Sequence, residues 1–365
     1  MYSDADKVIG TDTGGNLVRM RKLLLMMLLL SVLVLPVSAS EIVAPPVPDD
    51  VESLLPDEQE NIGESLLYIL KEAFQKMQPQ VADATKIMSK ILGFSMILSV
   101  LRSFSGKSKE IVELTGVLVI ATLLMSNSNS LIRNGTETIW KISEYGKLLC
   151  PILTATLAAQ GGSLTAASIY GATAIFDTVI CSLISSALVP MIYIYLVIAI
   201  VNAASGDDML LRLGNSMKGL MTWILKILLY VFVGYISISG IISGTADQTA
   251  VKATKLTLSG MIPVVGGILS DASEAILVSA GLIKNALGVY GFLSIVAITI
   301  TPFLLIGINY LSLKLITAFA GLFVSKTLSK LLDDFTGALG LVLGMTGSVC
   351  LIQLISIVCF LKGMG

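Results

Sequence analysis

The chain alternates long runs of apolar residues with short clusters of charged ones. A transmembrane helix needs about 20 consecutive, mostly apolar residues to cross the bilayer. Six runs of at least 19 residues contain no Asp, Glu, Lys or Arg and are rich in Leu, Ile, Val and Ala: 114–132, 148–176, 178–206, 227–246, 285–313 and 335–361. The pattern predicts an all-α, polytopic helical membrane protein with six spans.

A shorter apolar run at 87–101 leaves a seventh span open. As a helix it would extend about 22 Å, which is less than the roughly 30 Å of a hydrocarbon core. Lys86 and Lys90 could extend to the interface, and an interfacial helix fits the run equally well. The two runs that flank Asp177 could also form a re-entrant pair. We therefore expect about 6–7 transmembrane helices.

Residues 20–39 have the pattern of a secretory signal peptide. Basic residues at positions 19, 21 and 22 precede an apolar stretch, and small residues then offer a cleavage site between Ala39 and Ser40. An uncleaved N-terminal anchor is the alternative. Residues 1–19 form a polar extension, and the later Met20 is a more usual start, which is consistent with a misassigned start site.

Residues 40–86 are expected to form an acidic extracytoplasmic linker that ends in an amphipathic helix. The stretch 40–65 holds eight acidic residues, four prolines and no basic residue, which is typical of a solvated segment. Apolar residues then recur at helical spacing, which predicts a helix on the membrane surface or on a partner; a short docking helix without specificity is the simpler alternative. These apolar residues are Leu66, Leu67, Leu70, Phe74 and Met77. Residues 87–365 are then the multi-span membrane domain.

Composition agrees with a membrane protein. Hydrophobic residues make up 55% of the 365 positions and charged residues only 13%, whereas about 25% of an ordinary soluble domain is charged. So few charges cannot coat a soluble protein of this length, and the lipid bilayer is the expected environment. The net charge of −1 offers no basic surface for nucleic acid.

The residue types argue against an enzyme. The chain has no histidine, which removes the commonest general base and the commonest metal ligand. The four cysteines all lie in apolar runs without a C-x-x-C pair, so they are expected to be buried apolar groups. No phosphate-binding loop, G-x-S-x-G or H-E-x-x-H motif is present. We expect neither a cofactor nor a metal.

Charged residues inside apolar runs are candidate functional groups, because an ionisable side chain at membrane depth usually faces the bundle interior or water. Asp177 has 29 uncharged residues on each side, and Lys226 lies within the apolar stretch 219–244. Asp177 either lines an ion or solute path, paired with Lys226 or Lys284, or lies in a solvated loop between two helices.

Residues 260–285 interrupt the apolar pattern with a turn. Pro263, Gly266 and Gly267 break the helix. Asp271 and Glu274 then form a capping box at the start of a new helix, and Lys284 and Asn285 follow about three turns later. Irregular backbone at membrane depth is tolerated only beside protein or water, so this segment either lines a cavity or is a surface loop.

The stretch "IPVVGGILSDASEAILVSAGLIKNALGVYG" (262–291) resembles the stage III sporulation protein AE family of endospore-forming bacteria. The signal peptide, acidic N-terminal stretch and span layout agree with the resemblance over roughly 20–365. It implies a multi-pass component of the sporulation channel complex in the mother-cell membrane around the forespore. It also implies partners: other stage III A-operon proteins and a forespore-side channel protein. The family supplies no catalytic residues.

Two other functions remain open on the residues alone. A stand-alone secondary transporter could use Asp177 as its coupling carboxylate, and a purely structural scaffold would need no path at all. A channel subunit should purify with partner proteins, whereas a carrier should move solute alone in liposomes.

If the signal peptide is cleaved, the mature chain begins at or near Ser40, because Val37 and Ala39 place small residues at both recognition positions. N-terminal sequencing of protein purified from membranes checks this. A sequence that begins at Met1 or Met20 would contradict it.

Overall fold

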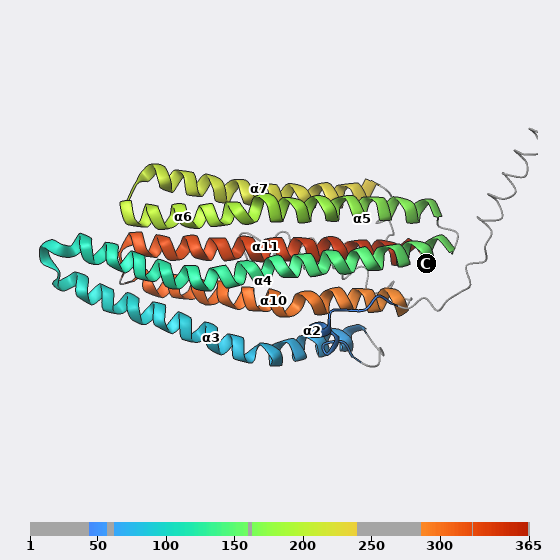
Figure 1. Cartoon of the computed structure of the whole chain (residues 1–365), viewed down its shortest axis with the longest axis horizontal. Coiled ribbons are helices and arrows are strands. Elements are labelled where there is room, and N and C mark those ends of the chain that lie inside the picture. Colours follow the sequence, from blue (N-terminus) through green and yellow to red (C-terminus); the bar gives the residue numbers. More distant parts are fainter. Residues whose placement is uncertain (1–43, 57–61, 160–162, 239–285, 323, 364–365) are drawn as a thin grey trace, which may run out of the picture. The chain divides into compact units, whose positions relative to one another are not determined.

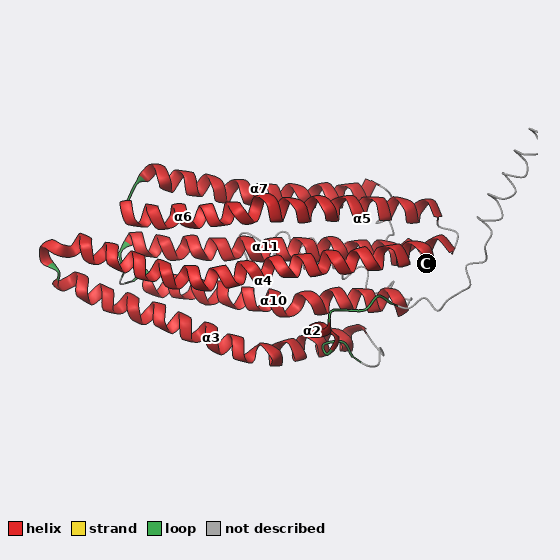
Figure 2. Ribbon diagram, viewed as in Figure 1, coloured by secondary structure: helices red, strands yellow, loops and turns green. Residues whose placement is uncertain are grey.

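The computed structural model describes residues 44–56, 62–159, 163–238, 286–322 and 324–363, and all regular structure in these segments is helical (Figure 2). The predicted all-α class is confirmed for this part of the chain. The elements are α2 (Asp49–Glu52), α3 (Ile62–Phe104), a 3-10 turn (Gly106–Ser108), α4 (Lys109–Ala159), α5 (Ser163–Leu183), a π-helical turn (Ile184–Leu188), α6 (Val189–Ser205), α7 (Asp208–Ile238), α10 (Ala286–Ala320) and α11 (Lys326–Gly363).

Helix α11 is the centre of the bundle. An 18-residue apolar stretch of it is buried along its whole length, and α4, α5, α6, α7 and α10 all pack against it (Figure 1). A helix that is apolar on most sides lies either in a protein interior or in lipid, and here the neighbouring helices cover it. Phe335 near its start and Phe360 near its end are both fully buried, so the core runs along almost the entire helix.

A short turn makes α6 and α7 antiparallel neighbours. Helix α6 ends at Gly206, whose φ of 68° places it in the left-handed region that glycine adopts without strain. The Gly206 N–H donates to the Asn202 carbonyl at 2.8 Å. The Asp207 carboxylate then accepts a hydrogen bond from the Met209 N–H at 2.8 Å and caps the start of α7. The chain therefore reverses within two residues, and α7 returns along α6.

Six helices in the described part of the chain are long and apolar enough to span a membrane, but their boundaries differ from the predicted runs. The run 114–132 and the first part of 148–176 belong to one helix, Gly106–Ala158. The rest of 148–176 and the run 178–206 belong to another, Ala167–Ser205. The short run 87–101 lies in Ile62–Phe104. The predicted number of six still agrees, because three predicted runs form only two helices and the short run 87–101 adds one helix.

The charged residues at 133–147 explain the wrong boundaries. They end an uncharged run, yet helix α4 continues through them. The whole helix has 51 residues and is about 77 Å long at 1.5 Å per residue. Charge stops a helix from lying in lipid but does not stop it from being a helix. The run 227–246 is described only as far as Ile238, the last residue of α7.

Residues 44–56 pack against the bundle, which differs from the solvated linker predicted for 40–65. Val47, Val51 and Leu54 are buried against the bundle, while the acidic side chains between them are exposed. The Lys141 ammonium on α4 contacts the Asp50 carboxylate at 2.7 Å. Alternating apolar and acidic residues allow this segment to be acidic and docked at once.

The predicted amphipathic helix is part of α3. Its buried positions are Ile69, Ala73 and Met77, whereas Leu67 and Phe74 are exposed. Whether those exposed side chains contact the membrane surface or a partner stays a prediction. The extension 1–19, the signal peptide 20–39 and its cleavage site lie outside the described residues.

Candidate functional site

Asp177 lies in the interior of the bundle and not in a loop. It is 3% exposed on α5, and its carboxylate accepts hydrogen bonds from side chains of two other helices. The Ser143 hydroxyl of α4 donates to Oδ2 at 2.6 Å, and the Gln353 amide of α11 donates to Oδ1 at 2.9 Å. The Cys181 thiol, one turn along α5, lies 3.8 Å from Oδ1. The loop and the re-entrant pair predicted as alternatives are both wrong.

The pairing of Asp177 with Lys226 is also wrong. Lys226 is exposed on α7, and within the described segments no Lys or Arg forms an ion pair with Asp177. Within the described segments the partners of the carboxylate are therefore neutral hydroxyl and amide donors. Burial of a carboxyl group without hydrogen bonds would cost several kcal/mol, so these donors are what permits Asp177 at this depth.

Gly146 allows the Gln353 amide to reach Asp177. A Cβ atom at Gly146 would lie 2.4 Å from the Gln353 amide nitrogen and 2.7 Å from the amide carbon, closer than atoms can approach. Helices α4 and α11 therefore meet here at backbone-to-side-chain contact, a use of small residues that is common between membrane helices. The sequence does not reveal this role, because Gly146 is only one of 32 glycines.

The layer around Asp177 has further hydrogen-bonding capacity. The Gln353 Oε1 and Thr173 Oγ1 atoms are buried and have no hydrogen-bond partner among the described residues. Thr173 lies one turn before Asp177 on α5. We call Ser143, Thr173, Asp177 and Gln353 the Asp177 layer. It is a buried polar layer with one carboxylate and no nucleophile–base pair.

A second polar cluster surrounds Asp334 near the start of α11. The Asp334 carboxylate contacts the Lys330 ammonium at 2.7 Å and accepts a hydrogen bond from the Tyr195 hydroxyl of α6 at 3.0 Å. A Cβ atom at Gly337 would lie 2.4 Å from the Lys218 ammonium of α7, so that lysine packs beside the same cluster. Sequence reasoning missed it because these charges lie just outside the apolar run; the four-residue spacing of Lys330 and Asp334 was the available signal.

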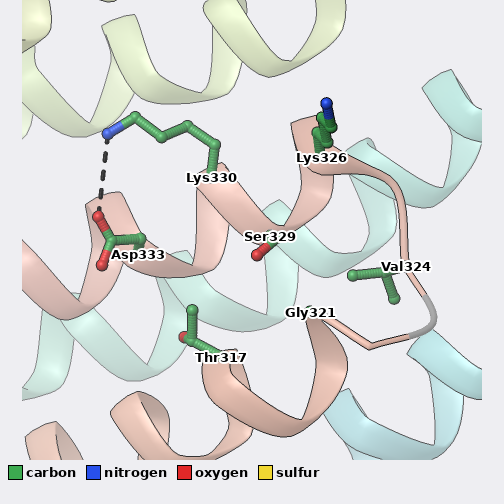
Figure 3. A pocket seen from close by; sticks show the side chains of 7 residues that line it. All are labelled: Thr317, Gly321, Val324, Lys326, Ser329, Lys330 and Asp333. Carbon is green, nitrogen blue, oxygen red and sulfur yellow. Dashed lines mark ion pairs between the residues drawn. The ribbon is translucent and has the colours of Figure 1, made fainter.

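The turn between α10 and α11 borders a cavity of about 420 Å³. Figure 3 shows the Lys330 ammonium directed toward Asp333, at 3.9 Å, and the Lys326 side chain extended away from Thr317 and Ser329. The Thr317 hydroxyl already donates to the Leu313 carbonyl at 2.8 Å. The lining residues therefore do not converge on a common point as they do in a catalytic centre.

The described segments show no candidate metal centre, and seven predicted site residues lie outside them. Within the described residues no group of three or more His, Cys, Asp or Glu side chains could hold a metal ion. The four cysteines are free and buried, as expected from the sequence. The predicted turn and cap residues lie outside the described segments: Pro263, Gly266, Gly267, Asp271, Glu274, Lys284 and Asn285.

The sequence of residues 50–363 matches the family model for stage III sporulation protein AE. The chain belongs to this family. A curated relative, the stage III sporulation protein AE of Bacillus subtilis (strain 168), is 25% identical over 185 residues, which cover 51% of this chain and 46% of the relative. The chain thus matches about half the length of that relative. No solved structure matches. The family resemblance of residues 262–291 is confirmed by the wider match.

Replacement of Gly146 by Ala should detach Gln353 from Asp177. The new methyl group occupies the position of the amide, and overpacking of this kind costs about 1–3 kcal/mol. Thermal unfolding in detergent should show a lower midpoint for Gly146→Ala. Gly171→Ala is the matched control, because a Cβ atom at Gly171 has no neighbour within 4 Å.

The double variant Gly146→Ala/Gln353→Ala tests the contact directly. It should lose less stability than the sum of the single variants, because the truncated side chain leaves room for the methyl group. Strict additivity would show that Gly146 and Gln353 do not interact.

Proposed function

We propose that this protein is a multi-pass membrane subunit of a channel complex that links mother cell and forespore during sporulation. It would lie in the mother-cell membrane around the forespore and associate with other stage III A-operon proteins and a forespore-side partner. The main support for this proposal is the family match over residues 50–363, which covers nearly the whole described bundle. The six helices that are long and apolar enough to span a membrane agree with it.

The interior of the bundle supports a subunit over a stand-alone transporter. A solute path through one chain would need a water-filled opening along its helices, and in the described segments α11 is enclosed by five helices. The deepest carboxylate, Asp177, is bonded to α4 and α11. Such a layer joins helices together. A channel would then form between this chain and its neighbours in the complex.

The proposal predicts that the full-length protein purifies with its partners. A tagged chain extracted in mild detergent from sporulating cells should bring down other stage III A-operon proteins, as measured by mass spectrometry. An equally tagged, unrelated six-span protein from the same cells is the control. Isolation of the chain alone, together with solute transport by that chain in liposomes, would overturn the proposal in favour of the transporter.

Substitutions of Asp177 provide a second test that distinguishes a channel subunit from a stand-alone transporter. Asn at this position can still accept from Gln353 and donate to the Ser143 hydroxyl, so Asp177→Asn should form heat-resistant spores at close to the normal frequency. Asp177→Leu leaves both partners buried and unpaired, at about 1–3 kcal/mol each, and should reduce the protein level and spore count together. A stable Asp177→Asn variant that forms no spores would mean that an ionisable group is required, as a transporter needs.

A further inference from the structure

The exposed side of α4 carries a long, mostly polar stripe, in which Trp140 and Leu148 are the exposed large apolar residues between Arg133 and Leu148. Arg133, Glu137, Glu144 and Lys147 are exposed, and Lys141 lies between them, half-exposed, on the same face. The spacing of three and four residues places all five on one side of a helix. Arg133 and Glu137 form an ion pair at 2.7 Å. Uncharged but polar side chains continue the stripe toward the start of α4: Thr115, Thr122, Ser126, Asn129 and Ser130.

Helix α3 extends the charged surface sideways. The contact of Lys141 with Asp50, and the hydrogen bond of Lys76 to the Asp50 carbonyl at 3.4 Å, place this part of α3 beside the middle of α4. The exposed side chains of α3 from Lys71 to Lys90 are mostly polar, and Phe74 is the large apolar exception. The polar ones are Lys71, Gln75, Lys76, Gln78, Gln80, Asp83, Thr85, Lys86, Ser89 and Lys90. We call this surface, together with the α4 stripe, the α3–α4 charged side.

The side of the bundle formed by α5 and α7 is apolar at the same height, by which we mean the same position along the helix axes. The hydrogen bond from Ser143 to Asp177 at 2.6 Å shows that α5 around Asp177 lies level with the middle of α4. The Phe176 ring contacts the Phe232 ring at 5.2 Å between centroids, so α7 around Phe232 is level with them too. The exposed large side chains at this height are Ile175 and Val179 on α5 and Trp223, Ile227, Tyr230 and Val231 on α7.

A bilayer offers the same environment all around a protein at a given depth, so a single bundle cannot satisfy both sides in lipid. Charges on the lipid side cost about 2.5–3.5 kcal/mol each at mid-membrane even on the most permissive scale. The charged stretch of α4 from Arg133 to Lys147 alone rises about 21 Å at 1.5 Å per residue, too far for side chains to reach one interface. Lys226 is the single exposed charge of α7 between Leu220 and Tyr235, and its four-carbon stem can follow the apolar surface.

We infer that the α3–α4 charged side lines an aqueous lumen in the assembled membrane complex, at the depth where α5 and α7 face lipid. The geometry carries this assignment of the two sides, and only the identity of the lumen as the sporulation channel rests on the proposed function. Charged side chains of both signs, with Arg133 next to Glu137 and Lys141 next to Glu144, would hydrate the wall without selecting one sign of ion.

Cysteine labelling at matched heights tests the inference in membranes from sporulating cells. The four native cysteines are first replaced by Ala in the full-length chain. Single cysteines are then placed at Glu144 and Gln75 on the charged side and at Ile175 and Tyr230 on the apolar side. A small, charged thiosulfonate reagent reacts only with a thiolate in contact with water, so the charged-side positions should react more than about tenfold faster than the apolar-side positions.

Two other labelling patterns would overturn the inference. Equally fast reaction at all four positions would place this height outside the bilayer. Equally slow reaction would mean that the charged side is covered by protein. A maleimide on a bulky polymer separates a lumen from an open surface: exclusion of the polymer at Glu144 supports the lumen, and its reaction there overturns it.

The accumulation of each variant and its co-purification with stage III proteins are measured separately from the labelling rates. Lys141→Cys and Val179→Cys are the second matched pair, should Glu144→Cys or Ile175→Cys fail to accumulate, because the contact of Ser143 with Asp177 places Val179 level with Lys141. The labelling pattern does not depend on partner identity. Loss of the co-purifying stage III proteins with an intact pattern would therefore overturn the proposed function alone, and the reverse result would overturn only the lumen assignment.

Discussion

The fold depends on the complete burial of α11. This helix has almost no polar face to turn outward, and an 18-residue stretch of it is covered on all sides. Between membrane helices the hydrophobic effect gives little drive for association, since lipid is as apolar as the helices, so close packing must supply it. Helices α4, α5, α6, α7 and α10 each contact α11, and these contacts set their mutual arrangement.

Packing alone would let apolar helices slide past one another, and two polar positions on α11 prevent this. Asp334 binds Tyr195 of α6, and Gln353 binds Asp177 of α5. The two positions are 19 residues apart, which is about 28 Å along a helix and close to the thickness of a hydrocarbon core. Hydrogen bonds between membrane helices average only about 0.6 kcal/mol. Their main contribution here is to fix the register between α11 and the α5–α6 segment.

Sequence reasoning found the fold class and the family, and it correctly singled out Asp177 as unusual. It could not find the partners of Asp177, because Ser143 and Gln353 are 34 and 176 residues away in the chain and neither residue type is rare. It also treated charged clusters as the ends of spans. Residues 133–147 show why this fails: the charges lie on one exposed stripe while Ile139, Ile142 and Leu149 keep the other side of α4 buried.

The sequence by itself determined that the chain is helical and membrane-associated, because the length of an apolar run and the scarcity of charge are local properties. Only the tertiary structure decided which faces are inside, because a helix exposes every direction until its neighbours are placed. The same holds for the division between a charged side on α3 and α4 and an apolar side on α5 and α7. Each of these helices has one exposed face. The exposed faces combine into a charged and an apolar surface only when packing around α11 fixes the order of the helices.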